Sequence, residues 1–403
     1  MRITHHRFVS TVLFLALPSW AWGHNEINLT PNTAVDAAMV VNYRSDSSVE
    51  KGRPWYVTGA MMGGEAVPAS EDFSVDDLFI TVTHVGEDNV YGLIKLASHQ
   101  GSDAAFEHAW LGYRLVSKER SFLNIEAGRM AGLFSPANLQ HSDSRLMSEA
   151  NLALDVFLGR QYIDNGLRLL WGNDRGLSLG VETWQGEAFP ATSGDGGGAS
   201  DVFFKYQNIS RNVSWSVGGW YMQAKAASRS DTRYESGHSH GVVVDDIEAY
   251  WFDGDTSLYG VHLDVQWQVS SRLTFGLDTE WLWQKVDGSI RDETRIAKLE
   301  SEANGGWIEP SISFQRHTVG LRYEQMVLNN EFSGVAGEAL AALAHLNNTG
   351  HNPTRSTLVY RYQIQPTLAL RAELLSDKSL PQREERWLVG LIWEKNLWRL
   401  KKE

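Results

Sequence analysis

Apolar and polar side chains alternate with a period of two along most of this chain. Near the C-terminus, Leu358, Tyr360, Tyr362 and Ile364 are separated by Val359, Arg361 and Gln363. After a turn at Pro366, the alternation continues from Leu368 to Leu374. Successive side chains of a β-strand point to opposite faces, so each such segment has one oily face and one charged face. Strands of this kind form a sheet between an apolar medium and water.

The same alternation recurs in segments spread over the whole chain. Many of them run for about nine to eleven residues, the length that a tilted strand needs to cross a bilayer, whereas strands of soluble sandwiches are usually shorter. Counting paired segments gives roughly sixteen strands, enough to leave a water-filled lumen. We therefore predict an all-β fold, a transmembrane antiparallel β-barrel. The clearest segments are 110–115, 123–128, 167–171, 177–181, 259–267, 275–284 and 319–324.

Short and long connections alternate between these segments. Tight turns are expected near residues 86–89, 172–176, 208–212, 270–271 and 366. Long polar loops are expected at residues 131–160, 186–200, 224–255, 286–309 and 328–356. Short turns at one end and long extracellular loops at the other are typical of bacterial outer-membrane barrels, and soluble domains rarely have so many long loops.

The N-terminus has the features of an export signal. Arg2 and Arg7 give it a basic start, residues 8–17 form a short apolar run, and residues 21–23 offer small side chains at a cleavage position. We expect cleavage after residue 23 and a single barrel domain over residues 24–403. A membrane anchor is the alternative, but the apolar run is about half of the ~20 residues that a spanning helix needs. The expected location is the bacterial outer membrane, among its lipid and lipopolysaccharide.

The composition excludes several classes of protein and of site. The chain has no cysteine, so disulfides, Cys nucleophiles and Cys-ligated metals are excluded. Its net charge of −13 disfavours nucleic acid as a partner. Its 16 Trp, 13 Tyr and 15 Phe fit aromatic girdles at the two bilayer interfaces. A secreted glycan-binding β-protein that stacks sugars on Trp is the alternative explanation for these aromatic residues.

Charged residues at strand ends and on the first long loop form the candidate site of a pore. Fixed charges raise or lower the cost for an ion to leave bulk water, so opposed charges in a narrow pore select among ions. The alternative is that they form ordinary ion pairs within the polar face of the sheet. Arg129 and Arg160 are the strongest candidates because they flank the loop. The full set is Arg114, Arg129, Arg160, Arg168, Glu126, Asp143, Glu149 and Asp155.

Two histidines in another expected loop indicate a second function. His238 and His240 lie close together, with Asp245 and Asp246 downstream, and neutral imidazole and carboxylate are ordinary zinc ligands. A metal-linked channel that captures zinc through these loop histidines is therefore an alternative to a simple pore. We expect no enzyme and no cofactor, because no serine stands at a recognised spacing from a strand histidine and no phosphate-cradling glycine motif is present.

Two stretches of the chain resemble a known family. Residues 123–139 read LNIEAGRM followed by AGLFSPANL, which resembles the strand that enters the constriction loop of Gram-negative porins. Together with GRQYIDNGLRLLWG at residues 159–172, this stretch is most similar to the porin O and P family, the phosphate-selective-porin-like group. The resemblance implies a trimeric channel of roughly sixteen strands. Its third loop, here about residues 131–159, would fold into the pore as a constriction.

The chain departs from that family in two respects. Such porins usually finish on an aromatic residue, whereas here Trp398 is followed by the largely charged residues 399–403. The closing strand therefore either covers residues 387–393 or runs on to Trp398. Anion-selective relatives carry dense lysines in the pore, and because this chain is acidic we do not carry phosphate selectivity over to it. The sequence thus predicts a passive porin for small hydrophilic solutes or ions, with the homotrimer that the resemblance implies.

Overall fold

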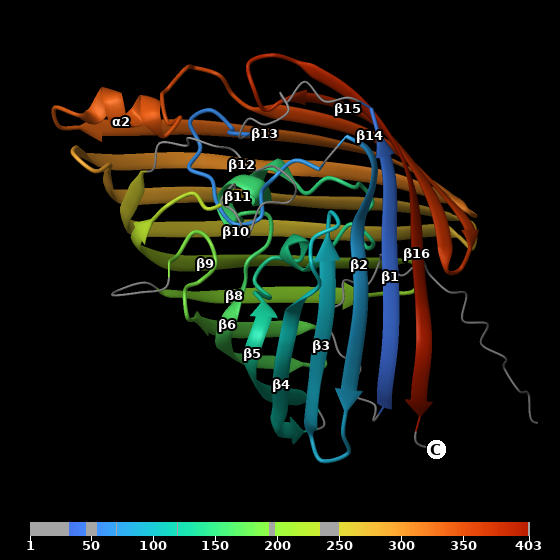
Figure 1. Ribbon diagram of the computed structural model, residues 1–403. Coiled ribbons are helices and arrows are strands. Elements are labelled where there is room, and N and C mark those ends of the chain that lie inside the picture. The colour runs from blue at the N-terminus through green and yellow to red at the C-terminus, as the bar shows by residue number, and fades with distance from the viewer. Residues whose placement is uncertain are drawn as a thin grey trace, which may run out of the picture.

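Sixteen antiparallel strands form one closed barrel in the residues that the computed structural model describes, 32–45, 55–69, 71–118, 120–192, 198–233 and 250–401 (Figure 1). Each strand pairs with its neighbours in sequence, and β1 (Asn32–Arg44) pairs with β16 (Glu384–Lys401) to close the sheet. The predicted fold class, an antiparallel β-barrel of about sixteen strands, is confirmed. None of the helices in the described residues is long and apolar enough to span a bilayer.

Strand length varies around the barrel. A tilted strand crosses a bilayer with about nine to eleven residues, so the strands of 17 to 20 residues, β9 to β13 and β16, extend well beyond the hydrocarbon. Between β1 and β16, the bounds of the strands are β2 (Asp72–Val85), β3 (Val90–His99), β4 (Ala105–Lys118), β5 (Ser121–Ala131), β6 (Ile163–Asn173), β7 (Leu177–Trp184), β8 (Gly198–Ile209), β9 (Val213–Arg229), β10 (Trp251–Ser270), β11 (Leu273–Arg291), β12 (Ile296–Phe314), β13 (His317–Ser333), β14 (Thr354–Gln365) and β15 (Leu368–Lys378). The helices are a 3-10 helix (Ala137–Leu139), α1 (Leu152–Leu158) and α2 (Gly337–Leu343).

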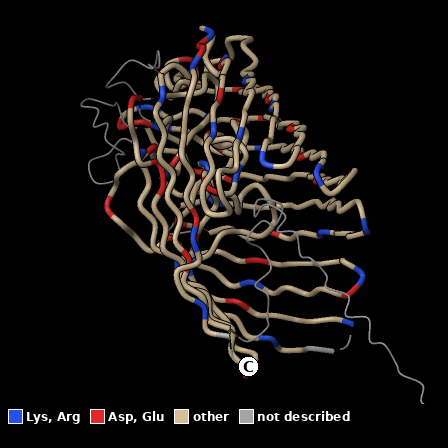
Figure 2. Tube along the Cα trace, turned by 90° about the vertical axis from the view of Figure 1, so that its right-hand side faces the viewer, with Lys and Arg blue, Asp and Glu red and all other residues tan. Residues whose placement is uncertain are grey.

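Tight turns join the strands at one end of the barrel. The expected turns are confirmed at residues 86–89, 174–176, 210–212, 271–272 and 366–367. Figure 2 shows basic residues at several of these turns. We number the connections at the other end in chain order: L1 (45–71), L2 (100–104), L3 (132–162), L4 (185–197), L5 (230–250), L6 (292–295), L7 (334–353) and L8 (379–383).

The prediction of a long loop at residues 286–309 is wrong. β11 continues to Arg291 and β12 begins at Ile296, so residues 292–295 alone connect them. The loops expected at 224–255 and 328–356 are likewise shorter than predicted, because the adjoining strands continue into both ends of each. Beyond the bilayer a hairpin no longer needs an apolar outer face. Its polar residues therefore resemble a loop when only the alternation of the sequence is considered.

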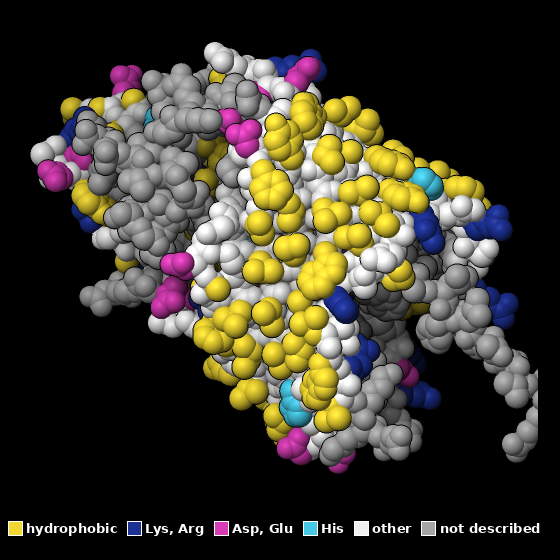
Figure 3. All heavy atoms as spheres, turned by 45° about the vertical axis from the view of Figure 1, so that its right-hand side comes forward, with side chains coloured by type: hydrophobic (Ala, Val, Ile, Leu, Met, Phe, Trp, Pro, Cys, Tyr) yellow, Lys and Arg dark blue, Asp and Glu magenta, His cyan; other side chains and the backbone are white. Residues whose placement is uncertain are grey.

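An apolar belt covers the outside of the barrel, and Figure 3 shows such side chains gathered on the outer wall. Aromatic pairs border the belt on β10 and β11: Tyr259 stacks on Trp283 with ring centroids 5.3 Å apart, and Trp267 lies 5.8 Å from Phe275. From Tyr259 to Trp267 the strand rises roughly 26 Å along its own axis, which is about 20 Å along the membrane normal at the usual tilt and lies within the ~25 Å apolar band of a membrane barrel. Exposed members of the belt include Leu111, Ile125, Leu167, Val202, Val261, Leu321, Leu358 and Leu374.

The closing strand follows the longer of the two expected alternatives. β16 runs through Trp398 to Lys401, and Trp398 lies opposite Val35 in the register with β1. The charged residue after Trp398 does not prevent the strand from continuing, because Arg399 still pairs with Ala34.

An apolar cluster inside the barrel joins L1, L3 and the wall. L1 contributes Trp55 and Met62, and L3 contributes Phe134 and Phe157, all of them buried. The described residues of these loops fold into the barrel and pack against inward apolar side chains of β7 to β13. This packing removes the apolar surfaces of both the loops and the wall from water. The sequence predicted a polar, water-filled lumen, but this side of the lumen is filled by apolar side chains instead. The wall side chains are Trp184, Phe203, Trp220, Met222, Leu258, Leu282, Trp307 and Met326.

Candidate functional site

L3 crosses the interior of the barrel and is bonded to carboxylates of the wall on several sides. Backbone N–H groups or hydroxyls of L3 donate to four wall glutamates, which lie on β7, β11, β13 and β15. Four contacts on separate strands fix the loop across the lumen, and those to charged carboxylates are the stronger ones. The pairs are Leu133 N with Glu182 at 3.1 Å, Ser135 Oγ with Glu280 at 2.7 Å, Leu152 N with Glu324 at 2.6 Å, and Ser148 Oγ with Glu373 at 2.8 Å.

Arg168 anchors the start of L3. Its guanidinium donates to Glu126 at 2.6 Å, to Glu182 and to the carbonyl of Ala131, the last residue of β5. Glu126 also accepts a hydrogen bond from the hydroxyl of Tyr91 at 2.7 Å. All the charged members are buried, so two residues of the predicted pore set, Arg168 and Glu126, hold the entry of the loop in place.

L1 lies directly on the end of α1 in L3. Gly159 ends α1 in the left-handed conformation, and its carbonyl accepts from the backbone N–H of Glu65 at 2.9 Å. A Cβ on Gly159 would lie 2.8 Å from the Gly63 carbonyl oxygen and from the Cα of Gly64. Only glycine therefore permits this approach of the two backbones. The crossing fixes the position of the next residue, Arg160.

Arg160 connects L1 to L3 through its side chain. Nε donates to Asp155 at 3.0 Å, and Nη2 donates to the carbonyl of Val67 at 2.8 Å. Burial alone would lower the pKa of Arg160, but the negative charges of Asp155 and Glu149 outweigh it and raise the pKa. The guanidinium is thus a fixed positive charge inside the barrel.

Two pockets lie between L3 and the side of the wall formed by β14 to β16 and β1 to β3. The larger, with about 590 Å³ of empty space including open solvent, we call the β2 pocket. The smaller, with about 420 Å³ on the same measure, we call the β16 pocket. Glu149 and Arg160 line both pockets. Charged side chains dominate the remaining lining, which includes Arg44, Glu65, Asp76, Asp77, His99 and Arg145 in the β2 pocket and Asp155, Arg355, Asp377, Glu384 and Arg386 in the β16 pocket.

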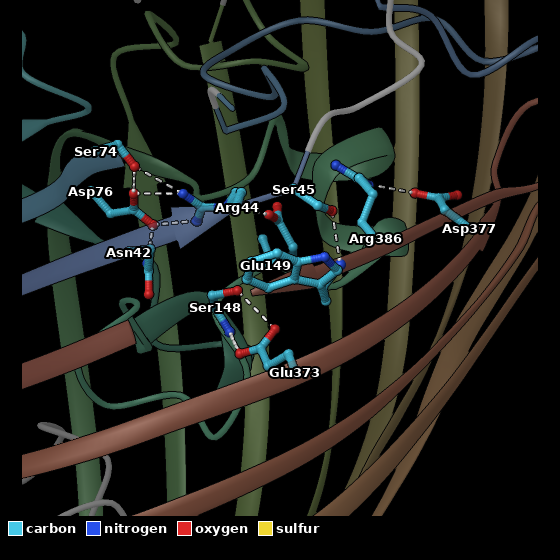
Figure 4. A network of polar contacts seen from close by, with 12 residues as sticks. Asn42, Arg44, Ser45, Ser74, Asp76, Ser148, Glu149, Glu373, Asp377 and Arg386 are labelled. Atoms are coloured by element: carbon cyan, nitrogen blue, oxygen red, sulfur yellow. Dashed lines mark hydrogen bonds and ion pairs between the residues drawn. The ribbon is translucent and has the colours of Figure 1, made fainter. Parts of the chain in front are cut away.

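Figure 4 shows how the wall places charges around Glu149. Arg44, at the end of β1, donates to Asp76 at 2.8 Å, and its Nε lies 3.5 Å from a Glu149 oxygen. On the other side, Arg386 of β16 donates to Asp377 of β15 at 3.1 Å. Positive and negative groups therefore alternate along the wall that faces this part of L3.

Glu149 keeps its negative charge although it is surrounded by protein. Burial alone would raise the pKa of Glu149, but the positive charges of Arg44, Arg386, Arg355 and Arg160 outweigh it and hold the pKa at about 2. The two shared residues of the pockets are therefore one permanent anion and one permanent cation.

The structure gathers only part of the predicted pore set around the pockets. Glu149, Arg160 and Asp155 line them. Asp143 is buried within L3, where it accepts from the backbone N–H of Ser144 at 2.8 Å, and it does not line either pocket. His238 and His240 lie outside the described residues.

The two other arginines of that set lie away from the pockets. Arg114 is near the tight turns, 3.4 Å from Asn124 and with its guanidinium 5.6 Å from the ring of Phe122. Arg129 is near the opposite end of β5, on the strand face that it shares with the exposed Ile125. Alternation along a strand places such a residue on the outside of the barrel.

Two β-bulges supply wall residues that the alternation did not predict. Val40 and Val41 of β1 face Asp77 and Val75, so Asp76 is an extra residue in β2. Lys95 and Leu96 of β3 face His108 and Phe106, so Glu107 is an extra residue in β4. A bulge lets two consecutive side chains point to one face. The adjacent polar pairs, Asp76 with Asp77 and Glu107 with His108, are the signal in the sequence, since each breaks the period of two.

Solved structures with a similar fold are outer-membrane barrels. OprB of Pseudomonas putida has a TM-score of 0.52 at 11% identity, with 94% of this chain and 97% of that chain covered. A loop L8 deletion mutant of OmpT, an outer membrane protein of Vibrio cholerae, has a TM-score of 0.50 at 10% identity, with 91% and 100% covered. At these identities the likeness concerns the fold alone. No protein-family model matches the sequence, and no curated protein is similar to it.

Proposed function

We propose that the protein is a passive porin of the bacterial outer membrane, through which small hydrophilic solutes or ions diffuse past L3. The exposed apolar belt with its aromatic borders supports a place among outer-membrane lipid and lipopolysaccharide. Membership of the porin O and P family, removal of residues 1–23 as a signal and assembly as a homotrimer belong to the same proposal. They rest on the resemblance and the sequence features given above.

The observation that carries the proposal is the pair of charged pockets that share Glu149 and Arg160. Between L3 and the wall, a solute meets an anion and a cation side by side, with further charges of both signs around them. Such groups replace part of the water that a polar solute loses in a narrow passage. The route therefore favours small polar or charged solutes over apolar ones.

The apolar cluster makes this a narrow channel. It occupies the side of the lumen formed by β7 to β13, which leaves the charged side as the route. We infer a conductance well below that of an open barrel of the same strand number, because ion current scales with the cross-section of its narrowest part.

We propose no catalytic role. The hydroxyl of Ser142 donates to Asp77, and the same carboxylate lies 2.6 Å from Nδ1 of His99. The serine thus contacts the carboxylate rather than the imidazole, whereas a serine nucleophile needs the imidazole as its base.

Planar-bilayer recording tests the proposal. The purified protein should give discrete ohmic current steps, and Glu149→Gln should shift the permeability ratio toward anions by about fivefold, because one fixed charge a few ångströms from an ion is worth about 1 kcal/mol in water. Glu302→Gln is the matched control, since that side chain is 71% exposed and paired with Lys285 on the outer rim. A silent membrane, or equal ratios for all three proteins, contradicts the proposal.

A further inference from the structure

A group of imidazoles and carboxylates gathers where L3 meets β3 and β4. Oε1 of Glu107 lies 3.6 Å from Nδ1 of His141, and Oε2 lies 3.8 Å from Nε2 of His108. One ligand atom from each of these residues lies within 4.8 Å of the others. The side chains of Glu107 and His141 are each 8% exposed, and the side chain of His108 is 12% exposed. His99 is the nearest further imidazole, with Nε2 3.3 Å from Glu107.

The bulge in β4 creates this group. In a regular strand, consecutive residues face opposite sides of the sheet, so either Glu107 or His108 would point to lipid. The extra residue at Glu107 turns both side chains inward, at the cost of a backbone pairing in the wall. His141 of L3 then completes the group from within the barrel.

The spacing of these atoms fits a transition-metal site. Two imidazoles and a carboxylate are a set of ligands that zinc takes in proteins, with metal–ligand distances of about 2.0–2.2 Å and a tetrahedral arrangement. Such bonds place ligand atoms roughly 3.4 Å apart. Here the two imidazole nitrogens lie 3.6 and 3.8 Å from different oxygens of Glu107, and one atom from each residue lies within 4.8 Å of the others, so a small movement of the side chains closes the set around an ion. The fourth position is open to water or to His99. The Nδ1 of His99 lies 2.6 Å from Asp77, as the second nitrogen of a metal-ligating imidazole commonly does with a carboxylate.

We propose that Glu107, His108 and His141 bind a divalent transition cation of the zinc type, and that the bound ion ties L3 to the barrel wall. The site is distinct from His238 and His240. Because its ligands come from β4 and from L3, the ion binds only while the loop is folded into the barrel. Binding therefore stabilises that position of the loop by linkage. This role does not depend on which solute the barrel passes.

Lys95 is a competitor within the site. Its Nζ lies 2.8 Å from Oε2 of Glu107 and 3.8 Å from the ring centroid of Phe79. A metal ion has to share the carboxylate with this ammonium group, and repulsion between the two cations weakens binding. Lys95→Met should therefore raise the affinity for the ion about tenfold or more. A gain in affinity is a result that misfolding does not produce.

The test uses the full-length protein in detergent, stripped with a chelator, in a His238→Ala/His240→Ala background. Cobalt(II) titration, followed by visible absorption, should give one equivalent with tetrahedral bands that zinc then displaces. His141→Ala and Glu107→Gln should each lower the affinity about a hundredfold, since each removes a ligand. His317→Ala, which removes an exposed imidazole near the tight turns, is the matched control and should change nothing.

Hydrogen exchange tests the tie between L3 and the wall. Zinc should slow amide exchange in L3 of the background protein and leave the exchange of His141→Ala unchanged. The proposal is overturned if the background protein takes up no cobalt or zinc at micromolar concentrations. It is equally overturned if uptake is the same in His141→Ala and Glu107→Gln, or if Lys95→Met does not bind more tightly.

Discussion

Ser148 of L3 donates both its backbone N–H and its hydroxyl to the carboxylate of Glu373 on β15, at 2.7 and 2.8 Å. Arg371 lies 3.1 Å from the same carboxylate, and both wall residues are buried. The carboxylate of Glu373 therefore holds the middle of L3, and the buried guanidinium of Arg371 pairs with that same carboxylate. The position of the loop, and with it the shape of both pockets, depends on this wall pair.

Glu373→Ala should destabilise the protein and release L3. The substitution removes two acceptors of Ser148 and leaves the buried guanidinium of Arg371 without its carboxylate, which costs roughly 3–5 kcal/mol. Urea unfolding in lipid vesicles measures the change. The control is Glu302→Ala, whose exposed pair with Lys285 contributes about 0–1 kcal/mol. Equal effects of the two substitutions would mean that Glu373 does not hold the loop.

Gly159→Ala should separate L1 from L3. Its φ of +60° and the 2.8 Å approach of Gly64 add a backbone penalty to a steric clash. Gly350→Ala is a matched control, because Gly350 has a φ of +72° and a Cβ there meets nothing within 4 Å. We expect the control to cost about 1–2 kcal/mol and Gly159→Ala to cost distinctly more, with faster hydrogen exchange in residues 55–69. Indistinguishable unfolding energies would contradict the crossing.

Glu149 gives the channel a specific pH dependence. Its pKa of about 2 lies below the ordinary 4.5. The stability that its charge adds is thus complete above pH 4.5 and is lost as the pH falls toward 2. The difference in permeability ratio between the wild type and Glu149→Gln should accordingly persist at pH 3, where exposed carboxylates are largely protonated, and disappear only below pH 2. Reversal potentials measured at pH 7, 4 and 3 check this. A difference that vanishes by pH 4 would contradict the charge network around Glu149.

The alternation of the sequence predicts most of the barrel. Leu358 and Leu374 are exposed on the outer face as expected. The two faces of the sheet meet different media, so apolar side chains recur at every second residue of a strand. The same rule places Arg129 outside, two residues after Ala127 on the outward face of β5. The strand-end position of Arg129 suggested the pore, but the direction of its side chain follows from the alternation.

The filled lumen and the pocket walls depend on long-range contacts that the alternation does not reveal. Trp281, Leu282 and Trp283 are consecutive apolar residues, and Leu282 is fully buried inside. A run that is apolar on both faces is the signal for such filling. Arg44 and Glu373 gave no local signal, because their roles arise only when L3 is folded against strands far away in the sequence.

Thiol labelling in planar bilayers tests the central claim, that solutes pass L3 through the charged pockets. The chain has no cysteine, so Ala69→Cys in the β2 pocket and Gln382→Cys in the β16 pocket each introduce a single thiol. Ala339→Cys, exposed on α2, is the control. We predict that anionic and cationic methanethiosulfonates lower the single-channel conductance of both pocket variants and shift their ion preference in opposite directions. The control should keep its conductance. Unchanged currents in the labelled pocket variants would contradict the account.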